Sequence, residues 1–364
     1  MGCDICDEIE VENYKVVKEI DKNQNDLTRS YLLRSPTNVN EYVYKSINVI
    51  ALKKEEKNTM FNEINILKNI NHPNVIEIKN DYYSKDNKFI NIITEYAEEG
   101  NLLQKFEEQK KKNQYFEENE LLDWFIQILL ALKYIHEKNI LHRNINPSNI
   151  FLMKDMAKLG NFGVATALSP TINYSKTLVT APQYLAPEVY KNSKYTYEAD
   201  IWALGVTFYQ LIILDYPFEG SSLEEIQKNI KTGNKKPVPK DCKIDEKFIK
   251  IINEMMLNSP DKRITLPKIL EESIIKSRIQ CYLIQQKFSQ IEAQKTIKEF
   301  ENEEKEKKRT VPVVQEEEKE NEKEETETEE QKKLKEKEMQ ERKDKKAKYD
   351  LYRHMSTLNK IVNK

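Results

Sequence analysis

Hydrophobic residues in the first hundred positions occur mainly in short runs that are rich in Val, Ile, Leu and Tyr. Such runs, bounded by polar residues, are typical of β-strands. Five strands are predicted, at Tyr14–Ile20, Ser30–Arg34, Glu41–Asn48, Ile76–Tyr83 and Phe89–Tyr96. A helix is predicted between the third and fourth, at Glu56–Ile70, because Phe61, Ile64 and Leu67 recur there at helical spacing.

Beyond residue 100 the pattern becomes helical. One apolar stripe indicates a helix with at least one buried side, and it comprises Leu121, Leu122, Phe125, Ile126, Leu129, Leu130 and Leu132. Ala199–Leu214 is apolar nearly all round, as expected for a helix that passes through a core. Strands first and helices later predict an α+β fold with two lobes, a small β-rich N-lobe and a larger helical C-lobe.

Composition and charge exclude several classes of protein. The 364 residues are 38% hydrophobic with a net charge of −2, which does not suggest a nucleic-acid binder. No apolar run is long enough for a membrane span, and four cysteines make no disulfide framework, so we expect a cytoplasmic, reducing environment. The four histidines are scattered, and no metal site is predicted.

Two segments have the frame of a catalytic site. His142-Arg143-Asn144-Ile145-Asn146-Pro147-Ser148-Asn149 matches H-R-D-L-x-x-x-N, and Asn161-Phe162-Gly163 matches D-F-G, each with its aspartate replaced. Ala186-Pro187-Glu188 matches A-P-E. The chain therefore resembles a protein kinase over roughly residues 13–275. Tyr42-Val43-Tyr44-Lys45, with Asn62-Glu63 and His72-Pro73-Asn74, is similar to the NIMA-related (NEK) family.

This resemblance implies roles for single residues. Lys45 would pair with Glu63, Thr94 would be the gatekeeper, and Glu95–Ala97 would form the hinge, with Ala97 as its last residue. Asn149 would be the retained metal ligand of the catalytic loop. Glu188 is expected to pair with Arg263, and His142 and Phe162 to stack between the lobes. These last contacts are architectural and say nothing of catalysis.

The departures from the family pattern lie on the catalytic side. Asn144 cannot accept a proton from a substrate hydroxyl, as the family's aspartate does. Asn161 and Asn149 offer neutral amide oxygens, whereas Mg²⁺ favours anionic oxygens. Asn146 stands where the family has a lysine that supports the γ-phosphate, and Ala181 stands where it has a threonine that helps to select the substrate.

The glycine-rich nucleotide lid is also missing. No glycine lies between Gly2 and Gly100, and the three family glycines fall near Asn23, Asn25 and Thr28. Glycine lets backbone N–H groups approach phosphates closely. We therefore expect weak ATP binding at most, no required cofactor and no use of Mg²⁺.

Two interpretations stay open for each surviving polar residue. Lys45 and Glu63 are consistent with retained nucleotide binding and equally with a structural ion pair that fixes the helix. In active kinases the arginine at the position of Arg143 binds a phosphate on the activation segment. Four candidate phosphorylation sites lie in that segment here. These are Ser169, Thr171, Ser175 and Thr177, although exposed Ser and Thr are common in loops.

The N-terminal residues 1–12 are predicted to be a tail. Gly2 is a candidate for myristoylation, and Cys3 and Cys6 for the second, palmitoyl signal that stable anchoring needs. Against this, residue 6 is Cys where the pattern has Ser or Thr, and the neighbouring acids would be repelled by an anionic membrane. We favour the unmodified tail, and expect membrane tethering only if these residues are acylated.

Residues 276–310 are predicted to form an amphipathic helical extension, and 311–364 a charged tail, helical or disordered. Residues 315–330 carry ten acids and two lysines, whereas 331–364 carry twelve Lys or Arg and five acids. No heptad pattern runs through them. The end regains apolar residues at helical spacing, which would suit a short helix that docks on a partner.

The leading hypothesis is a catalytically impaired, NEK-like pseudokinase that acts as a scaffold or allosteric partner. The resemblance implies partners such as an active kinase or a microtubule assembly, bound through the C-terminal extension, and a cytoskeletal or ciliary location. Two alternatives remain: a weakly active Ser/Thr kinase with an atypical site, and a structural component of a cytoskeletal assembly.

Overall fold

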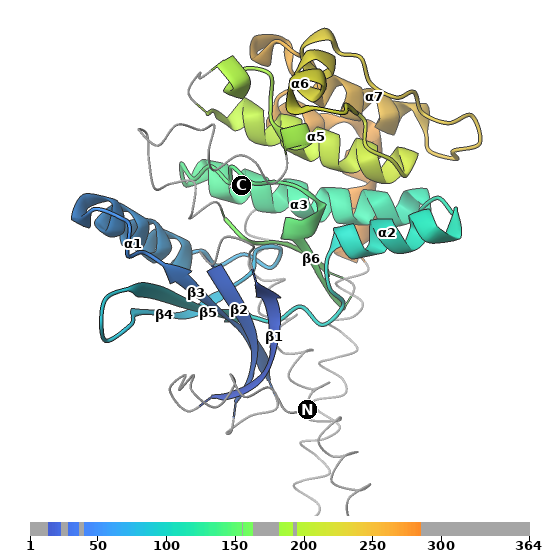
Figure 1. Ribbon diagram of the computed structural model, residues 1–364. Coiled ribbons are helices and arrows are strands. Elements are labelled where there is room, and N and C mark those ends of the chain that lie inside the picture. The colour runs from blue at the N-terminus through green and yellow to red at the C-terminus, as the bar shows by residue number, and fades with distance from the viewer. Residues whose placement is uncertain are drawn as a thin grey trace, which may run out of the picture. The chain divides into compact units, whose positions relative to one another are not determined.

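The computed structural model describes residues 14–22, 28–35, 40–154, 156–162, 182–191 and 195–284. The chain divides into two compact units, residues 1–279 and 280–364. The site and the contacts below all belong to the first unit. Within it, a β-sheet with one helix forms a smaller lobe, and a set of helices forms a larger one (Figure 1). The predicted two-lobed α+β fold is confirmed.

The smaller lobe is built on a five-stranded antiparallel sheet with the order β1-β2-β3-β5-β4. Its strands are β1 (Lys15–Lys22), β2 (Thr28–Arg34), β3 (Glu41–Asn48), β4 (Ile78–Tyr83) and β5 (Phe89–Glu95). All five predicted strands are confirmed, with ends displaced by at most two residues. β3 lies at the centre of the sheet, which fixes the position of Lys45 through pairing on both sides.

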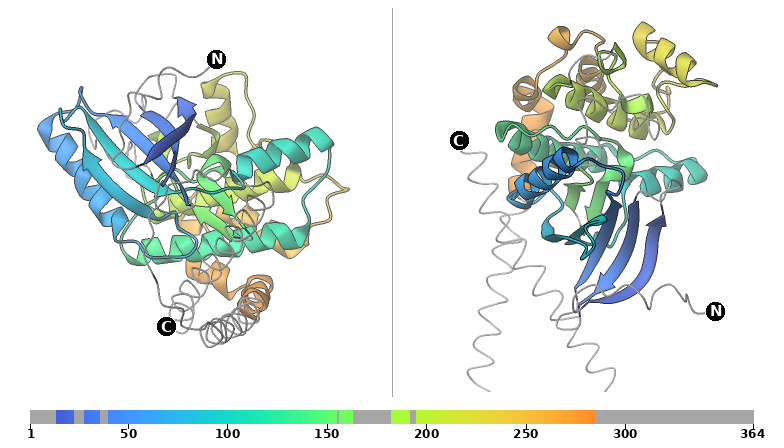
Figure 2. Two further views of the ribbon diagram at one scale, coloured as in Figure 1. Left: turned by 90° about the horizontal axis from the view of Figure 1, so that it is seen from below. Right: turned by 60° about the vertical axis from the view of Figure 1, so that its left-hand side comes forward.

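Helix α1 (Lys54–Lys68) lies beside this sheet (Figures 1 and 2). Its buried side carries Met60 and Ile64, both without exposed surface, and its Phe61 ring stacks on Tyr83 of β4 at 4.9 Å. The apolar periodicity of the sequence therefore identified the face of α1 that packs on the sheet. The same packing places Glu63, which lies one residue before Ile64, at the edge that faces the other lobe.

The larger lobe contains six helices among the described residues for which bounds are defined: α2 (Leu102–Lys112), α3 (Glu118–Glu137), α5 (Tyr197–Ile213), α6 (Leu223–Thr232), α7 (Glu246–Met255) and α8 (Leu266–Glu271). Short 3-10 turns lie at Pro147–Asn149, Pro182–Tyr184, Val189–Lys191 and Pro260–Lys262. Residues 273–284 are also helical. Every residue of α5 from Ala199 to Ile213 is buried, as its apolar sequence predicts.

The core of this lobe is aromatic where its main helices meet. The Phe125 ring of α3 makes edge contacts with Phe208 of α5 at 5.0 Å and with Phe248 of α7 at 5.1 Å. Gly205 allows α5 to approach α7 closely, because a Cβ atom there would lie 2.9 Å from the Cβ of Met255. Close packing of this core makes the helical lobe rigid, and the candidate site lies on that rigid lobe.

A short hairpin of β6 (Ile150–Met153) and β7 (Met156–Leu159) lies between the two lobes (Figures 1 and 2). Asn74, which precedes β4, is fully buried and donates from its amide to Gln127 of α3 at 3.1 Å and to the Ala157 carbonyl at 2.9 Å. The Ile76 amide donates to the Leu159 carbonyl at 2.9 Å. These bonds tie the smaller lobe to the hairpin, and the hairpin leads directly into Asn161.

The described end of the first unit is fastened to α3. Arg278 makes a bidentate contact with Asp123 and also donates to the side chain of Asn119 at 3.1 Å. The predicted helical extension thus has a described beginning, and the rest of the segment 276–310, with the tail 311–364, lies outside the described residues. Among the helices that are described, none combines the length and the apolar character needed to cross a membrane.

Candidate active site

The loop that begins at His142 is held by one buried carboxylate. Asp200, at the start of α5, accepts hydrogen bonds from the backbone amides of His142 and Arg143 and from the His136 ring, all at 2.9 Å. Burial acts to raise the pKa of Asp200, but these donors outweigh it, and the pKa is lowered. An ionised carboxylate inside the helical lobe therefore sets the path of the loop, and Arg143 takes a left-handed conformation with φ 66°.

Four asparagines form the centre of the site, and they bond to one another. The Asn161 amide nitrogen donates to the side-chain oxygen of Asn149 at 3.0 Å. The Asn149 nitrogen in turn donates to the Asn144 carbonyl at 2.8 Å. Asn161 has φ 51°, a left-handed conformation that asparagine tolerates better than most residues. The two residues expected at metal-ligand positions are thus brought together, and each occupies part of the other's hydrogen-bonding capacity.

Asn146 completes this group and has a structural role as well. Its amide nitrogen donates to the carbonyl and to the side-chain oxygen of Asn144, at 3.2 and 3.1 Å. Its own side-chain oxygen caps the short turn Pro147–Asn149 by accepting from the Ser148 amide at 2.9 Å. Because a lysine has no acceptor, it could not cap the turn in this way. No pattern in the sequence indicated this capping role.

His142 and Phe162 stack as predicted, with ring centroids 4.6 Å apart. The His142 ring is fully buried, and a ring nitrogen lies 3.1 Å from the Gly160 carbonyl. Burial lowers the pKa of His142 to about 4, and the nearby Asp200 only partly offsets this. The imidazole is therefore neutral at physiological pH and donates one hydrogen bond to Gly160. It serves as a packing element between the site and the core.

Glu63 has a partner that the sequence did not indicate. Its carboxylate lies 4.0 Å from the guanidinium of Arg143, and both side chains are about one-third exposed. Burial raises the pKa of Glu63, and Arg143 acts in the opposite direction. The contact joins α1 to the catalytic loop across the two lobes. The pairing of Glu63 with Lys45 stays a prediction, and Lys45 has an interaction of its own in the structure.

The candidate nucleotide-binding residues lie along β3 and β5. Lys45 is paired in register with Ile92, and Thr94 with Val43 one step along the sheet. Ala97, at the end of the expected hinge, is buried. The register places Lys45 and Val43 on the same face of β3, because side chains alternate along a strand. The sheet thus presents the expected lysine and gatekeeper positions side by side.

Glu95 of the hinge is used for an internal ion pair. Its carboxylate lies 2.7 Å from the ammonium of Lys158, a side chain with only 2% of its surface exposed, and it also accepts from the Glu77 amide at 2.9 Å. Lys158 was not among the predicted site residues. The available signal was a single lysine between apolar residues in the strand Met156–Leu159. The pair fixes the hinge to the hairpin that leads into Asn161.

Glu188 and Arg263 form the predicted ion pair, with two N–O contacts at 2.8 and 3.0 Å. Arg263 also donates to two backbone carbonyls and lies over the Trp202 ring at 5.1 Å. The other predicted positions lie outside the described residues. They are the glycine-loop positions Asn23 and Asn25, the candidate acylation residues Gly2, Cys3 and Cys6, Ala181, and the candidate phosphorylation residues Ser169, Thr171, Ser175 and Thr177. Thr28, the third loop position, begins β2.

Comparison with known proteins identifies the fold family. A model of the protein kinase domain matches residues 27–275. The chain belongs to the protein kinase family. It is NEK-like: Nek1 of Mus musculus, a serine/threonine-protein kinase, is 32% identical over 291 residues, covering 80% of this chain and 24% of that protein. Nek5 of Homo sapiens is 32% identical over 285 residues, covering 77% and 39%.

A third relative is the G2-specific protein kinase fin1 of Schizosaccharomyces pombe. It is 32% identical over 247 residues, covering 62% of this chain and 34% of that protein. The chain thus spans less than half the length of these three relatives. The kinase fold is held here by the Asp200 anchor and by the Glu188–Arg263 ion pair. The four asparagines, Asn144, Asn146, Asn149 and Asn161, lie at the positions of the family's catalytic loop and D-F-G motif.

The donor set at that centre does not match the preference of Mg²⁺. Kinases hold their metal ions with the D-F-G aspartate and the catalytic-loop asparagine. Here Asn161 and Asn149 contribute two neutral amides that are already bonded to each other. Within the described ranges no cluster of three or more His, Cys, Asp or Glu is arranged to hold a metal ion.

Proposed function

We propose that this chain is a NEK-like pseudokinase, impaired in phosphoryl transfer, that acts as a scaffold or allosteric partner. The observation that carries the proposal is the 3.0 Å hydrogen bond from Asn161 to Asn149. It joins the two metal-ligand positions of the family through groups that carry no charge. The Asp200 anchor and the Glu188–Arg263 pair are present around them, which favours a role for the fold itself.

Metal binding would have to break this bond without the help of a carboxylate. Mg²⁺ demands near-ideal octahedral geometry and favours anionic oxygen ligands. An amide oxygen supplies a dipole in place of a charge, and the Asn149 oxygen already accepts from Asn161. The site therefore provides less negative charge and fewer free oxygen ligands for Mg²⁺ than the family's site does. We propose that any nucleotide binds weakly and that neither nucleotide nor Mg²⁺ is required for function.

The proton-accepting position is also changed. Asn144 is an amide, which has no basicity at neutral pH, and its side-chain oxygen accepts from Asn146 at 3.1 Å. Positioned general-base catalysis contributes typically about 10²–10⁴-fold to rate. Since Asn144 and Asn161 would act on the same transition state, their effects do not add independently. The two replacements together favour a chain without useful transfer activity.

A weak Ser/Thr kinase is the second candidate, and specific observations favour it. Lys45 occupies its family position on the central strand β3, and Asn149 is retained in the catalytic loop. The relatives carry the name serine/threonine-protein kinase. A nucleotide held by Lys45, with a metal supported mainly by its own phosphates, would give slow transfer. The two candidates therefore differ in the magnitude of one measurable rate.

The deciding experiment is phosphate transfer from radiolabelled ATP to the chain and to a generic protein substrate, with Mg²⁺ or Mn²⁺. We expect no transfer above background. Transfer that Lys45→Ala abolishes would overturn the pseudokinase proposal and establish the weak kinase. The Lys45→Ala control matters because it separates this activity from that of a contaminating kinase.

A thermal melt tests the metal argument separately. A ligand at 100 times its Kd stabilises a protein by about 2.7 kcal/mol, enough to shift Tm visibly. We expect no Mg²⁺-dependent shift with ATP for the natural chain. The double variant Asn144→Asp with Asn161→Asp restores both carboxylates and should gain one, whereas Asn65→Asp on the exposed side of α1 should not. A Mg²⁺-dependent shift in the natural chain would contradict the proposal that Asn161 cannot support a metal ion.

Partners and location are proposed from the NEK likeness alone. We propose that the C-terminal extension binds protein partners, such as an active kinase or a microtubule-associated assembly, with a cytoskeletal or ciliary location. Membrane tethering is proposed only for a form acylated at Gly2, Cys3 and Cys6. Deleting residues 350–364 should remove a co-purifying partner without lowering the Tm of the kinase domain. Unchanged co-purification would contradict the role given to that segment.

A further inference from the structure

The connection from α7 to α8 contains a Ser-Pro pair that differs from the others in the chain. Ser-Pro pairs occur at residues 35–36, 169–170 and 259–260. Three positions after the serine, the first two have Asn38 and Ile172, whereas the third has a lysine, in the sequence Ser259-Pro260-Asp261-Lys262. Serine followed by proline, with a basic residue three positions after the serine, is the pattern that proline-directed serine/threonine kinases modify. Such a pattern needs support from its structural context.

The structure presents this segment at the surface of the helical lobe. Every residue from Leu257 to Lys262 is at least partly exposed, and Leu257 keeps 40% of its surface. The backbone at Ser259 is extended, with φ −83° and ψ 116°, and the residues after it form a single 3-10 turn. A second protein can therefore reach the serine side chain and those of the three residues that follow it.

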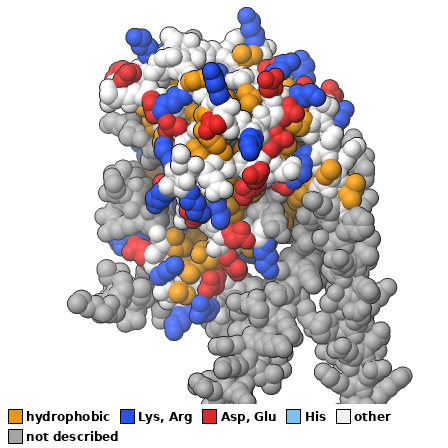
Figure 3. All heavy atoms as spheres, turned by 90° about the vertical axis from the view of Figure 1, so that its right-hand side faces the viewer, with side chains coloured by type: hydrophobic (Ala, Val, Ile, Leu, Met, Phe, Trp, Pro, Cys, Tyr) orange, Lys and Arg blue, Asp and Glu red, His pale blue; other side chains and the backbone are white. Residues whose placement is uncertain are grey.

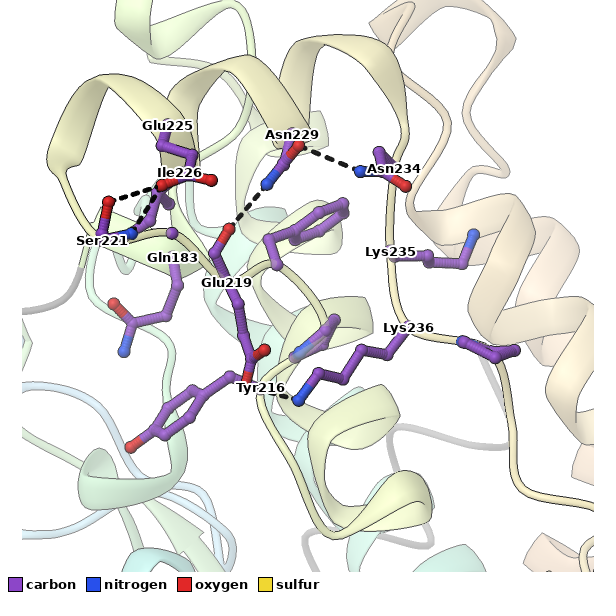
Figure 4. Close-up of a pocket in the computed structure, with 14 residues that line it drawn as sticks. Gln183, Tyr216, Glu219, Ser221, Glu225, Ile226, Asn229, Asn234, Lys235 and Lys236 are labelled. Atoms are coloured by element: carbon purple, nitrogen blue, oxygen red, sulfur yellow. Dashed lines mark hydrogen bonds and ion pairs between the residues drawn. The ribbon is translucent and has the colours of Figure 1, made fainter.

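The hydroxyl of Ser259 is not used by the turn that follows it. Its backbone carbonyl accepts from the Lys262 amide at 3.1 Å, which closes the turn, but its side chain makes no capping hydrogen bond. Ser221, before α6, is different, because its hydroxyl donates to the Glu225 carboxylate at 2.8 Å (Figure 4). A phosphate on Ser221 would be repelled by that carboxylate, whereas a phosphate on Ser259 would replace no capping contact.

The backbone on both sides of Ser259 is anchored to the lobe. Asn258 donates from its side chain to the Lys231 carbonyl at 2.7 Å. Arg263, which is buried, donates from its guanidinium to the Leu257 carbonyl at 3.1 Å. These contacts involve groups other than the Ser259 hydroxyl. A phosphate at the surface of this anchored turn therefore adds charge without unpacking the lobe.

Recognition of this site depends on charge close to the acceptor. On the face of the helical lobe that Figure 3 shows, acidic and basic side chains are interspersed, and the whole chain has a net charge of −2. A kinase therefore has to select its acceptor through the residues beside it. Lys262 is exposed, and its ammonium forms no ion pair with any of the residues that the structure describes. It is available to an acidic group on the kinase.

We propose that Ser259 is a phosphorylation site for a proline-directed serine/threonine kinase. Pro260 has no backbone N–H, so it fits a pocket that leaves no acceptor for that group, and Lys262 pairs with an acidic group of the kinase. The Ser259 hydroxyl oxygen attacks the γ-phosphorus of the ATP that the kinase holds. The bond from that phosphorus to the β–γ bridging oxygen breaks, ADP leaves, and the hydroxyl proton passes to the catalytic aspartate of the kinase.

The modified serine carries about 1.5–2 negative charges at neutral pH. They are added two residues from the exposed Leu257 and change the surface that a partner protein meets. This chain is the substrate in the reaction, and none of the asparagine-site residues takes part. The inference therefore stands independently of whether the chain itself transfers phosphate.

The test incubates the full chain with ATP and a proline-directed serine/threonine kinase, and locates phosphate by mass spectrometry. We expect phosphate on Ser259, at an initial rate at least about tenfold above that at Ser35, which lacks the basic residue; tenfold is the scale of one good charged contact. No phosphate on Ser259, or equal rates at the two serines, would overturn the proposal.

A parallel reaction without the added kinase is the control, and we expect no phosphate on Ser259 there. Phosphate on Ser259 in this control would mean that the chain modifies itself. That result would overturn both the assignment to a separate kinase and the pseudokinase proposal. Absence of phosphate in both reactions would overturn the assignment of Ser259 and leave the pseudokinase proposal unaffected.

Variants identify the residues that the kinase recognises. Lys262→Ala should lower the initial rate at Ser259 by about tenfold, whereas Lys268→Ala, which removes an exposed lysine outside the pattern, should change it by less than about twofold. Pro260→Ala restores a backbone N–H and should also lower the rate by about tenfold. The rates are compared at a temperature below the Tm of every variant. Equal rates for Lys262→Ala and Lys268→Ala, or an unchanged rate for Pro260→Ala, would overturn recognition by a proline-directed kinase.

Discussion

Acid destabilisation should originate largely at His142, and this can be tested quantitatively. The ring is fully buried between Phe162 and the loop that Asp200 holds. Its pKa is lowered from 6.5 to about 4 in the folded chain. Since the folded pKa lies below the unfolded one, the unfolded chain binds a proton first as the pH falls. The folded state therefore loses stability between about pH 6.5 and pH 4.

The size of the effect follows from the difference in pKa. A difference of one unit corresponds to about 1.36 kcal/mol, so the full shift of His142 is worth about 3 kcal/mol. At pH 5 the unfolded imidazole is almost fully charged and the folded one is still neutral. Stability should then already be about 2 kcal/mol lower than at pH 7.5, from this residue alone.

The assay is urea unfolding at pH 7.5, 6 and 5, for the natural chain and for His142→Gln. The glutamine variant cannot titrate, so it reports the pH dependence of every other group. We expect the natural chain to lose about 2 kcal/mol more than the variant between pH 7.5 and pH 5. An identical pH dependence for the two proteins would refute the conclusion that His142 stays neutral when folded.

Three further predictions concern contacts within the helical lobe and between the two lobes. Arg263→Met leaves Glu188 as a nearly buried, unpaired charge and should cost about 3–5 kcal/mol in urea unfolding, whereas Lys250→Met at an exposed pair should cost less than about 1 kcal/mol. A small loss at Arg263 would contradict this. Asn74→Ala removes two buried hydrogen bonds and should cost about 1–3 kcal/mol, with the largest gain in amide exchange at the hairpin between the lobes. Arg278→Ala should speed amide exchange of residues 273–279 while leaving α5 protected, and equal effects on both would contradict a local role.

Much of the fold followed from local pattern. The strands of the sheet and the helices α1, α3 and α5 are all visible in the periodicity of apolar residues, since that periodicity reports which side of an element is buried. The ends of the elements were displaced by up to two residues, because caps and turns decide them. Arg263 and Glu188 were paired correctly only through the resemblance to kinases, as nothing local connects residues that lie far apart in the chain.

The candidate site was predicted in part. Sequence patterns identified Asn144, Asn146 and Asn161 as replacements and Asn149 as a retained residue, without indicating any contact among the four. The structure shows that they bond to one another and that Asn146 caps a turn. Such a group depends on side-chain directions set by left-handed backbone at Asn161 and by the Asp200 anchor, and no periodicity reports these.

The sequence by itself determined which strands and helices follow one another along the chain. It also determined the chemical character of the site, because an amide side chain carries no charge and accepts no proton wherever it lies. Only the tertiary structure decided which groups neutralise each other. Glu63 meets Arg143, Glu95 meets Lys158, and Lys236 pairs with both Asp215 and Glu219. Ion pairs form over a few ångströms between residues that packing brings together, and local sequence does not encode those distances.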